Sequence, residues 1–264
     1  MSRTRPSDAA VEQRRQEILD HVVEAGEARI DDLTARFRVS LMTMHRDLDD
    51  LAERGLLRKL RGKVAAFPTL TRESADTNSG EKEALGEAAA RQVRPGQTVF
   101  IDDSTTLFPL VRRLAAVEGL TVITNSLQAA RLLGPAVDVV LAGGRYHHEF
   151  DSCAGPEVVE LLHNTRADVA FVSVTAVAVG RLFHPVREYA DLKRAVLQAA
   201  NHNVLVVDHS KFGRTATYAH GTVGDYDLLI TSEETPTEEI EAALNAGVAI
   251  EIVEHVDEGQ PYDS

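Results

Sequence analysis

The stretch from Ser40 to Leu51 constrains the fold more than any other part of this chain, because a turn leads there into an amphipathic helical pattern. Leu41, Met44, Leu48 and Leu51 recur at steps of three and four residues, which places them on one face of a helix. The Ser40 hydroxyl can accept a hydrogen bond from an amide of the first helical turn. The pattern predicts a helix that buries this apolar face and turns a mostly polar and basic face outward.

The segments on both sides of this helix indicate a small domain. Apolar spacing predicts one helix that begins near Val11 and another over residues 30–37. After the third helix, two short extended runs flank Arg61, Gly62 and Lys63, which predicts a β-hairpin. Three helices followed by a hairpin form a winged helix, in which the third helix enters the major groove of DNA.

The predicted hairpin is basic. From Arg54 to Lys63 the sequence has five Lys or Arg residues and no Asp or Glu. Such a segment can bind phosphates without reading bases, although a solvated basic hairpin on a small domain of another kind is the alternative. Asp47 is expected to have a structural role, pairing with a basic residue of the same domain. The candidate DNA-binding residues are Ser40, Met42, Thr43, His45, Arg46, Arg58, Lys59, Arg61 and Lys63.

Charge is distributed unevenly along the chain. Residues 1–70 have 13 Lys or Arg and 12 Asp or Glu, whereas the rest of the chain has 15 and 29. The balance is therefore +1 in the first part and -14 in the second, which together give the net charge of -13. The acidic part is expected to be repelled by DNA, so that only the first part binds it.

The second part alternates short apolar runs with helical patterns, which predicts an α/β fold with a mostly parallel sheet covered by helices. The predicted domains are a winged helix over 11–67 and an α/β domain over 81–254, joined by a polar linker over 68–80. The predicted strands are Thr98–Asp102, Thr121–Thr124, Asp138–Ala142, Asp168–Ser173, Asn203–Asp208, Leu228–Thr231 and Val248–Val253.

Polar residues or glycines follow four of these strands. In parallel sheets, ligands bind beyond the carboxyl ends of the strands. Hydroxyls and amides at a helix start can hold an anion, and a lysine or arginine adds charge for a phosphate, although Ser or Thr after a strand is also a common helix cap. The candidate effector-binding residues are Asp102, Asp103, Ser104, Thr105, Thr106, Asn125, Ser126, Gly143, Gly144, Arg145 and Lys211.

Both parts resemble the DeoR family of bacterial sugar-metabolism repressors. In the first, Ser40, Thr43, Arg46, Asp47 and Leu48 match the family pattern of the recognition helix. The resemblance implies a winged helix that binds double-stranded operator DNA, a sensor domain similar in fold to ribose-5-phosphate isomerase and CoA transferases, a sugar-phosphate effector, and a homo-oligomer, either a dimer or a tetramer.

The resemblance in the second part covers four strand ends and one helix. Glu188, Lys193 and Arg194 match the family in the helix before the Asn203–Asp208 strand, and Glu188 joins the candidate effector-binding residues on this ground. The segments that match the family are 102–106, 122–127, 141–144 and 208–213.

The chain departs from the family pattern at positions that concern specificity. His45 replaces an arginine of the recognition helix, which affects the operator sequence. Asp103 and Ser104 replace Ser-Gly, so a carboxylate stands where the resemblance places a phosphate and a glycine that eases backbone approach is lost. These changes predict an effector other than a simple sugar phosphate, weaker binding, or a displaced phosphate.

These observations predict a non-enzymatic, ligand-responsive regulator, expected to repress a carbohydrate-metabolism operon. A sugar-phosphate isomerase with a fused DNA-binding arm is one alternative, with Asp102, Glu188 and Lys211 as the groups for proton transfer. A constitutive regulator with a degenerate pocket is another.

The sequence predicts no cofactor and no metal site. The single cysteine, Cys153, excludes an intramolecular disulfide and a cysteine-based zinc site. The adjacent pair His147 and His148 is interpreted as a loop or surface feature, with a metal role as the less favoured alternative. No apolar run reaches membrane-spanning length and no signal-peptide core is present, so a cytoplasmic protein is expected.

Overall fold

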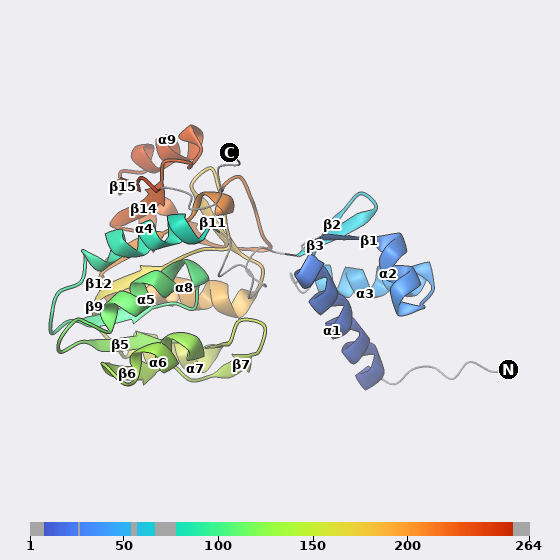
Figure 1. The fold of residues 1–264 in the computed structure, drawn as a ribbon, viewed down its shortest axis with the longest axis horizontal. Helices are drawn as coiled ribbons and strands as arrows, with labels where there is room; N and C mark the ends of the chain where they lie inside the picture. The colour runs from blue at the N-terminus through green and yellow to red at the C-terminus, as the bar shows by residue number, and fades with distance from the viewer. Residues whose placement is uncertain (1–7, 26, 54–56, 67–77, 256–264) are drawn as a thin grey trace, which may run out of the picture. The chain divides into compact units, whose positions relative to one another are not determined.

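The chain divides into two compact units, residues 1–73 and 74–264, which are described separately below. The computed structural model describes residues 8–25, 27–53, 57–66 and 78–255, drawn as coloured ribbon in Figure 1. Most of the predicted linker over residues 68–80 lies outside the described residues.

The first unit is a winged helix, as the sequence predicts. Its helices are α1 (Asp8–Ala25), α2 (Ile30–Phe37) and α3 (Leu41–Glu53). Its strands are β1 (Glu27–Arg29), β2 (Leu57–Leu60) and β3 (Lys63–Ala66), paired antiparallel in the order β1-β3-β2. Gly62 has a φ of 74° at the β2–β3 turn, a conformation that glycine adopts at little cost. Ile18, Leu33, Met44, Leu48 and Val64 are buried and form the centre of this unit.

One residue of the predicted apolar face of α3 is not buried. Met44, Leu48 and Leu51 are buried, whereas Leu41 is 49% exposed. Leu41 is the first residue of the helix, and helical side chains point back toward the N-terminus. The Leu41 side chain therefore projects past the end of the helix instead of onto the core, and the prediction for this residue was wrong.

Asp47 has the structural role that the sequence predicts, and the structure identifies its partners. Its side chain is 3% exposed, and its two oxygens accept hydrogen bonds from Arg14 Nε at 2.7 Å and Arg15 Nε at 3.2 Å. Both arginines are on α1. This carboxylate therefore fastens α3 to α1 from the inner side, while the neighbouring Arg46 is exposed on the outer side.

The second unit is built on one parallel sheet of seven strands, in the order β15-β14-β12-β9-β4-β5-β6. Every neighbouring pair is parallel, so all carboxyl ends lie at one edge. All seven predicted strands are present. They are β4 (Thr98–Ile101), β5 (Thr121–Thr124), β6 (Asp138–Leu141), β9 (Ala167–Val172), β12 (Ala200–Val206), β14 (Leu228–Ser232) and β15 (Ala249–Val253).

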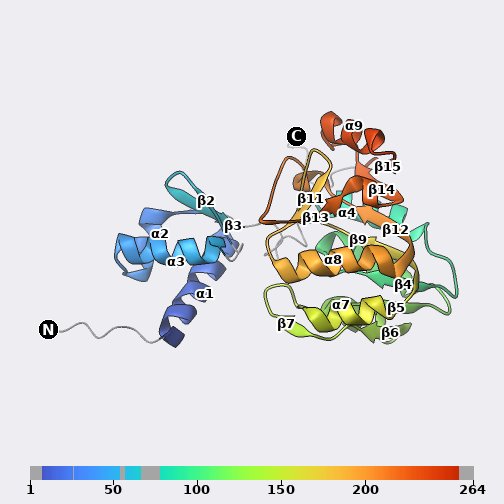
Figure 2. The ribbon, with the colours of Figure 1, turned by 180° about the vertical axis from the view of Figure 1, so that it is seen from behind.

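Helices cover both faces of this sheet, which confirms the predicted α/β class. Alternation along the strands supplies both cores: Phe100 packs on one side, and Val99 and Ile101 pack on the other. On the Val99 face lie α4 (Ser79–Ala90), α5 (Phe108–Leu114) and α6 (Leu127–Leu133), toward the viewer in Figure 1. On the Phe100 face lie α7 (Pro156–His163), α8 (Arg187–Ala199) and α9 (Thr237–Asn245), and Figure 2 shows α7 and α8 in front.

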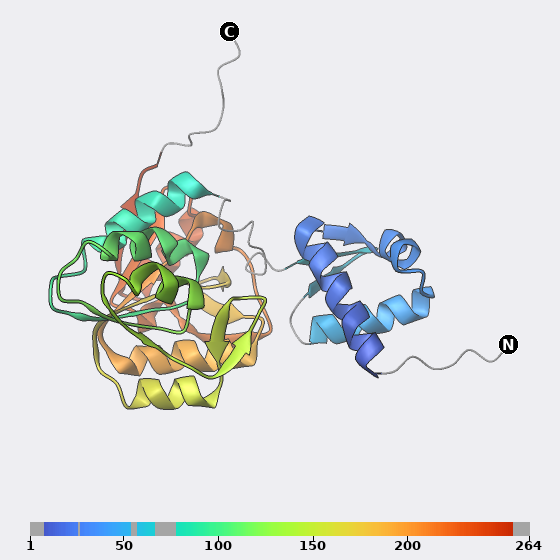
Figure 3. The ribbon, with the colours of Figure 1, turned by 60° about the horizontal axis from the view of Figure 1, so that its bottom comes forward.

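Two small sheets add to the main one, and the sequence analysis did not anticipate them. β7 (Arg145–His147) and β8 (Ser152–Ala154) form a hairpin whose two arrows are visible in Figure 3. β10 (Ala176–Ala178), β11 (Arg181–His184) and β13 (Tyr218–Thr222) form an antiparallel sheet. The described residues of this unit also form the short 3-10 turns η3 (Thr105–Leu107), η4 (His209–Lys211) and η5 (Val223–Asp225). No helix in the described part of the chain is long and apolar enough to span a membrane.

The contacts of Asp47 predict a large effect of one isosteric change. Asp47→Asn removes the negative charge that two arginines share, and charge-assisted hydrogen bonds of this kind contribute about 2–3 kcal/mol to the free energy of unfolding. Hydrogen exchange of the α1 and α3 amides should accelerate accordingly. Asp49→Asn is the matched control, since its exposed pair with Lys59 is worth about 0–1 kcal/mol. Equal effects of the two changes would contradict the role given to Asp47.

Candidate functional site

The outer face of α3 presents the candidate base-contacting residues. Met42 is 70% exposed and Arg46 is exposed, whereas Thr43 and His45 are half-buried. The Ser40 hydroxyl accepts a hydrogen bond from the backbone amide of Thr43 at 3.1 Å and lies 2.8 Å from the Thr43 hydroxyl. Ser40 therefore caps the helix, and Met42 and Arg46 are the side chains that project most freely.

The wing carries basic residues, but carboxylates of the same unit lie against two of them. Lys59 pairs with Asp49 on α3, and Lys63 Nζ lies 2.6 Å from Glu27 Oε2 on β1. Arg61 is exposed at the turn, and the side chain of Arg58 lies outside the described part. Exposed ion pairs contribute little, so Lys59 and Lys63 can exchange their carboxylates for phosphates at small cost.

At the carboxyl edge of the main sheet, Asp102 forms a deeply buried ion pair. Lys193 Nζ, on α8, lies 2.6 Å from Asp102 Oδ2 and also donates to the Ser173 carbonyl oxygen at 2.8 Å. Asp102 in turn accepts hydrogen bonds from the backbone amides of Ser104 and Ser173, each at 3.0 Å. Asp102 therefore joins the ends of β4 and β9 to α8 and sets the path of the loop that follows β4.

A second buried group lies where β12 ends. The Thr106 hydroxyl donates to Asp208 Oδ2 at 3.0 Å, and Lys211 Nζ lies 3.9 Å from the same oxygen. Burial raises the pKa of Asp208, but the Lys211 ammonium and the hydrogen bonds from Ser210 and Thr106 outweigh it, so the pKa lies below its usual range. Asp208 therefore stays ionised beside the buried Lys211 side chain.

Asp103, the residue that departs from the family pattern, is bound within the protein. It accepts a hydrogen bond from the Ser152 hydroxyl at 2.7 Å, and Ser152 lies 2.6 Å from the Tyr189 hydroxyl. Burial raises the pKa of Asp103, and the adjacent Asp102 carboxylate raises it further. The Asp103 carboxyl therefore holds a proton to a higher pH than an ordinary aspartate does.

Tyr189, whose hydroxyl contacts that of Ser152, is itself enclosed by other rings. Tyr189 is fully buried, stacks on His184 with ring centroids 5.0 Å apart, and lies 4.8 Å from the Phe150 ring. Burial and the nearby Asp103 raise the pKa of Tyr189, so its hydroxyl stays protonated. Burial and the Lys193 charge lower the pKa of His184, so this imidazole stays neutral.

The remaining predicted effector residues fall into separate contacts. Asn125 is buried and donates to the Cys153 carbonyl oxygen at 3.1 Å, and Ser126 caps α6 by accepting from the Ala129 amide. Arg145 is exposed and pairs with Glu188 at 3.3 Å, and Glu188 also lies 2.9 Å from His147 Nε2. Gly143 and Gly144 are exposed between β6 and β7, and Thr105 is half-buried in η3.

The candidate site list from the sequence omits several residues that organise this edge. Lys193 had a recognisable signal, because it shares the buried face of α8 with Tyr189, Leu192 and Val196, and a lysine among such residues requires a buried partner. Asp208 lies in a segment that the sequence analysis had matched. Ser152 and Ser173 had no such signal, since their roles depend on contacts between distant strands.

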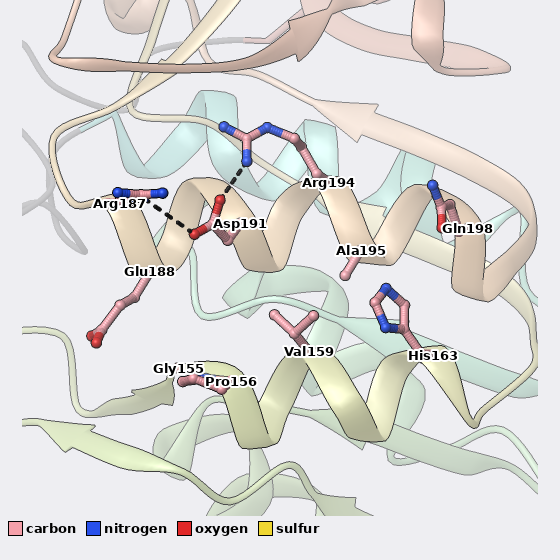
Figure 4. A pocket seen from close by; sticks show the side chains of 10 residues that line it. All are labelled: Gly155, Pro156, Val159, His163, Arg187, Glu188, Asp191, Arg194, Ala195 and Gln198. Atoms are coloured by element: carbon pink, nitrogen blue, oxygen red, sulfur yellow. Dashed lines mark hydrogen bonds and ion pairs between the residues drawn. The ribbon is translucent and has the colours of Figure 1, made fainter.

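A pocket of about 550 Å³ lies elsewhere, between α7 and α8 (Figure 4). Val159 and Ala195 face each other across it, and Asp191 on its rim is held by Arg187 and Arg194. Of the predicted effector residues, Glu188 alone lines this pocket. The pocket is therefore distinct from the groups around Asp102 and Asp208.

Both units of the chain match known protein domains. Residues 14–68 match the model of the DeoR-like helix-turn-helix domain, and residues 77–233 match that of the DeoR C terminal sensor domain. The HTH-type transcriptional regulator YgbI of Escherichia coli K12 is 32% identical, over 85% of this chain and 91% of the relative. The glycerol-3-phosphate regulon repressor of the same organism is 29% identical, over 91% of this chain and 98% of the relative. The repressor GlcR of Bacillus subtilis is 31% identical, over 83% of this chain and 88% of the relative.

Among solved structures, ribose 5-phosphate isomerase A from Methanocaldococcus jannaschii is 18% identical, with 52% of this chain and 55% of that chain covered and a TM-score of 0.38. That likeness is too distant to carry an argument. The matches to both domain models, in the order winged helix and then sheet, decide the family. The chain belongs to the DeoR family of DNA-binding transcriptional regulators, with a helix-turn-helix domain followed by a sensor domain.

Proposed function

We propose that this chain represses a carbohydrate-metabolism operon and that a phosphorylated sugar, bound at the carboxyl edge of the seven-stranded sheet, changes its affinity for operator DNA. The observation that carries the proposal is the group formed by Thr106, Asp208 and Lys211, which holds a buried ammonium beside the η3 turn. Relatives with repressor names, one of them for a glycerol-3-phosphate regulon, support the same function.

Unpartnered polar atoms support a ligand at this edge. Among the described residues, Asn125 Oδ1, Ser173 Oγ and Thr175 Oγ1 are buried without a hydrogen-bond partner, and all three residues follow β5 or β9. Leaving such atoms unpaired costs about 1–3 kcal/mol each. A bound sugar supplies hydroxyls that can pair with them.

The raised pKa of Asp103 bears on the departure from the family pattern. A protonated carboxyl carries no charge to repel a phosphate, and the Ser152 hydroxyl compensates for its burial. We infer that Asp103, in the pH range where its raised pKa keeps it protonated, opposes an anionic effector less than an ionised aspartate does.

The isomerase alternative finds no support in the arrangement of its residues. Asp102 is engaged by Lys193, Glu188 by Arg145 and His147, and Lys211 by Asp208. These contacts keep the three groups in separate pairs. We therefore propose ligand binding without turnover, and incubation with ribose 5-phosphate should give no ribulose 5-phosphate.

For DNA recognition, Arg46→Ala should lower affinity for the operator by about 1–3 kcal/mol while leaving affinity for unrelated DNA nearly unchanged, because we assign Arg46 to the base edges. Fluorescence anisotropy on a duplex selected by the wild-type protein from random DNA measures both affinities. Arg61→Ala is the contrast, since a phosphate contact should weaken binding to both duplexes and reduce the salt slope by about 1. An Arg46→Ala protein with unchanged operator affinity would place the recognition surface elsewhere.

For the effector, thermal unfolding of the full chain against sugar phosphates and their unphosphorylated parents should show a shift with a phosphorylated sugar alone. Ligand at about one hundred times its dissociation constant stabilises the native state by about 2.7 kcal/mol. Lys211→Gln and Thr105→Val should abolish or reduce that shift. Arg145→Gln should leave it nearly unchanged, because Arg145 is exposed and paired with Glu188. Loss of the shift in Arg145→Gln alone would move the site to the β6–β7 side.

Effector affinity should also depend on pH through Asp103. Its pKa is raised, so the carboxyl is neutral below that raised value and charged above it, and effector binding should weaken as pH rises through it. Asp103→Asn mimics the neutral form at every pH. The ratio of dissociation constants, wild type over Asp103→Asn, should therefore be near one at low pH and increase with pH, as titration calorimetry can measure. A ratio independent of pH would show that the Asp103 charge does not oppose the effector.

A further inference from the structure

A second polar cluster lies at the carboxyl edge of the sheet, on the β12–β14–β15 side. Glu81 is in the first turn of α4, His209 begins η4 after β12, and Glu234 lies between β14 and α9. One potential ligand atom from each residue lies within 4.8 Å of the others, and within the described residues no other group of three His, Cys, Asp or Glu does so. Helix α4 packs against β14 and β15, which brings these elements together (Figure 1).

The contacts of His209 are unusual for a hydrogen-bonded histidine. Its Nδ1 lies 2.8 Å from Glu81 Oε2 and also 2.8 Å from Glu234 Oε2. A ring nitrogen has one lone pair or one proton, so two carboxylate oxygens converge on a single position. Both oxygens are good ligands for a cation, as is a neutral imidazole nitrogen.

The Glu81 carboxylate is held by hydrogen bonds in the way that metal-binding carboxylates usually are. Its side chain is 1% exposed, and its Oε1 accepts hydrogen bonds from the His209 amide at 2.8 Å and from the Ser232 hydroxyl. These bonds orient the carboxylate and leave Oε2 facing His209 Nδ1. Metal-binding carboxylates are commonly held by such outer hydrogen bonds.

We propose that Glu81 Oε2, His209 Nδ1 and a Glu234 oxygen bind one divalent first-row transition-metal ion. With bonds of about 2.1 Å and angles between about 90° and 110°, neighbouring ligand atoms lie about 3.0–3.4 Å apart. The observed separations, 2.8 Å for two pairs and at most 4.8 Å for the third, require only small side-chain movements. His209 and Glu234 are partly exposed, so water can complete the coordination.

The donor atoms select among cations. One nitrogen and two carboxylates suit Zn²⁺ and Mn²⁺, with Zn²⁺ bound more tightly, whereas Mg²⁺ and Ca²⁺ prefer oxygen ligands throughout. His255 Nε2 lies 3.7 Å from Glu234 Oε1 and helps to hold that carboxylate in place. The ion would join the start of α4, the turn that carries Lys211 and the loop before α9. This inference is independent of the proposed effector.

The test uses untagged full-length protein, stripped with a chelator that is then removed, and titrated with Zn²⁺ or Mn²⁺ alone. Calorimetry should show one ion per chain, with Zn²⁺ tighter than Mn²⁺, no heat with Mg²⁺, and a higher thermal midpoint with Zn²⁺. Glu234→Gln and His209→Gln should each weaken Zn²⁺ binding by at least about tenfold to a hundredfold. Glu238→Gln removes an exposed carboxylate four residues away and should bind Zn²⁺ as the wild type does.

Two outcomes would overturn the proposal. One is the absence of saturable one-to-one binding in the wild type. The other is equal Zn²⁺ affinity in Glu234→Gln, Glu238→Gln and wild type, since the ion would then lie elsewhere. Glu234 is partly exposed, so its variant decides the matter even if His209→Gln fails to fold.

Discussion

The ion pair between Asp102 and Lys193 determines the arrangement of the sensor unit. Both side chains are almost completely buried, and removing one partner from such a pair costs about 3–5 kcal/mol because the other charge stays behind uncompensated. The pair is stabilised by backbone hydrogen bonds: the amides of Ser104 and Ser173 donate to Asp102, and the carbonyl of Ser173 accepts from Lys193. As a consequence, the loop after β4 has one path, and Thr106 reaches Asp208 beyond the intervening strand β9.

A buried carboxylate that pairs with basic side chains also fixes the winged helix. Adjacent residues of α3 have opposite tasks, since Asp47 points inward to two arginines of α1 and Arg46 points outward. A helix that presents side chains to a groove must be held at a defined rotation and height. The bidentate use of Asp47 supplies this restraint, so the outer face can vary in sequence without loss of the domain. That separation explains how His45 can differ from the family pattern in an intact winged helix.

Charges at the carboxyl edge of the sheet are compensated locally. Asp102 has Lys193, Asp208 has Lys211, Glu188 has Arg145, and Asp103 is shifted toward its neutral form. An acidic protein of net charge -13 can therefore offer an anion a site without general repulsion at short range. Within the described part of the chain, the unpartnered buried atoms that follow β5 and β9 belong to the neutral side chains of Asn125, Ser173 and Thr175, which can pair with hydrogen-bonding groups without any charge.

The sequence by itself determined the seven strands of the main sheet and the three helices and hairpin of the winged helix, because each has a local pattern of apolar residues or of turn residues. It also identified the strand ends as the place to look for a ligand. It did not reveal β7 and β8 or the sheet of β10, β11 and β13, whose strands have three to five residues and whose pairing joins segments as distant as Arg181 and Thr222.

The partners of the buried charges were decided only by the tertiary structure. Lys193 and Asp102 are 91 residues apart, Thr106 and Asp208 are 102 apart, and Glu81 and His209 are 128 apart. A local pattern can show that a charged residue faces the core, but burial requires only that some counter-charge be present. Which residue supplies that counter-charge depends on the order of the strands in the sheet, and that order is a property of the folded chain.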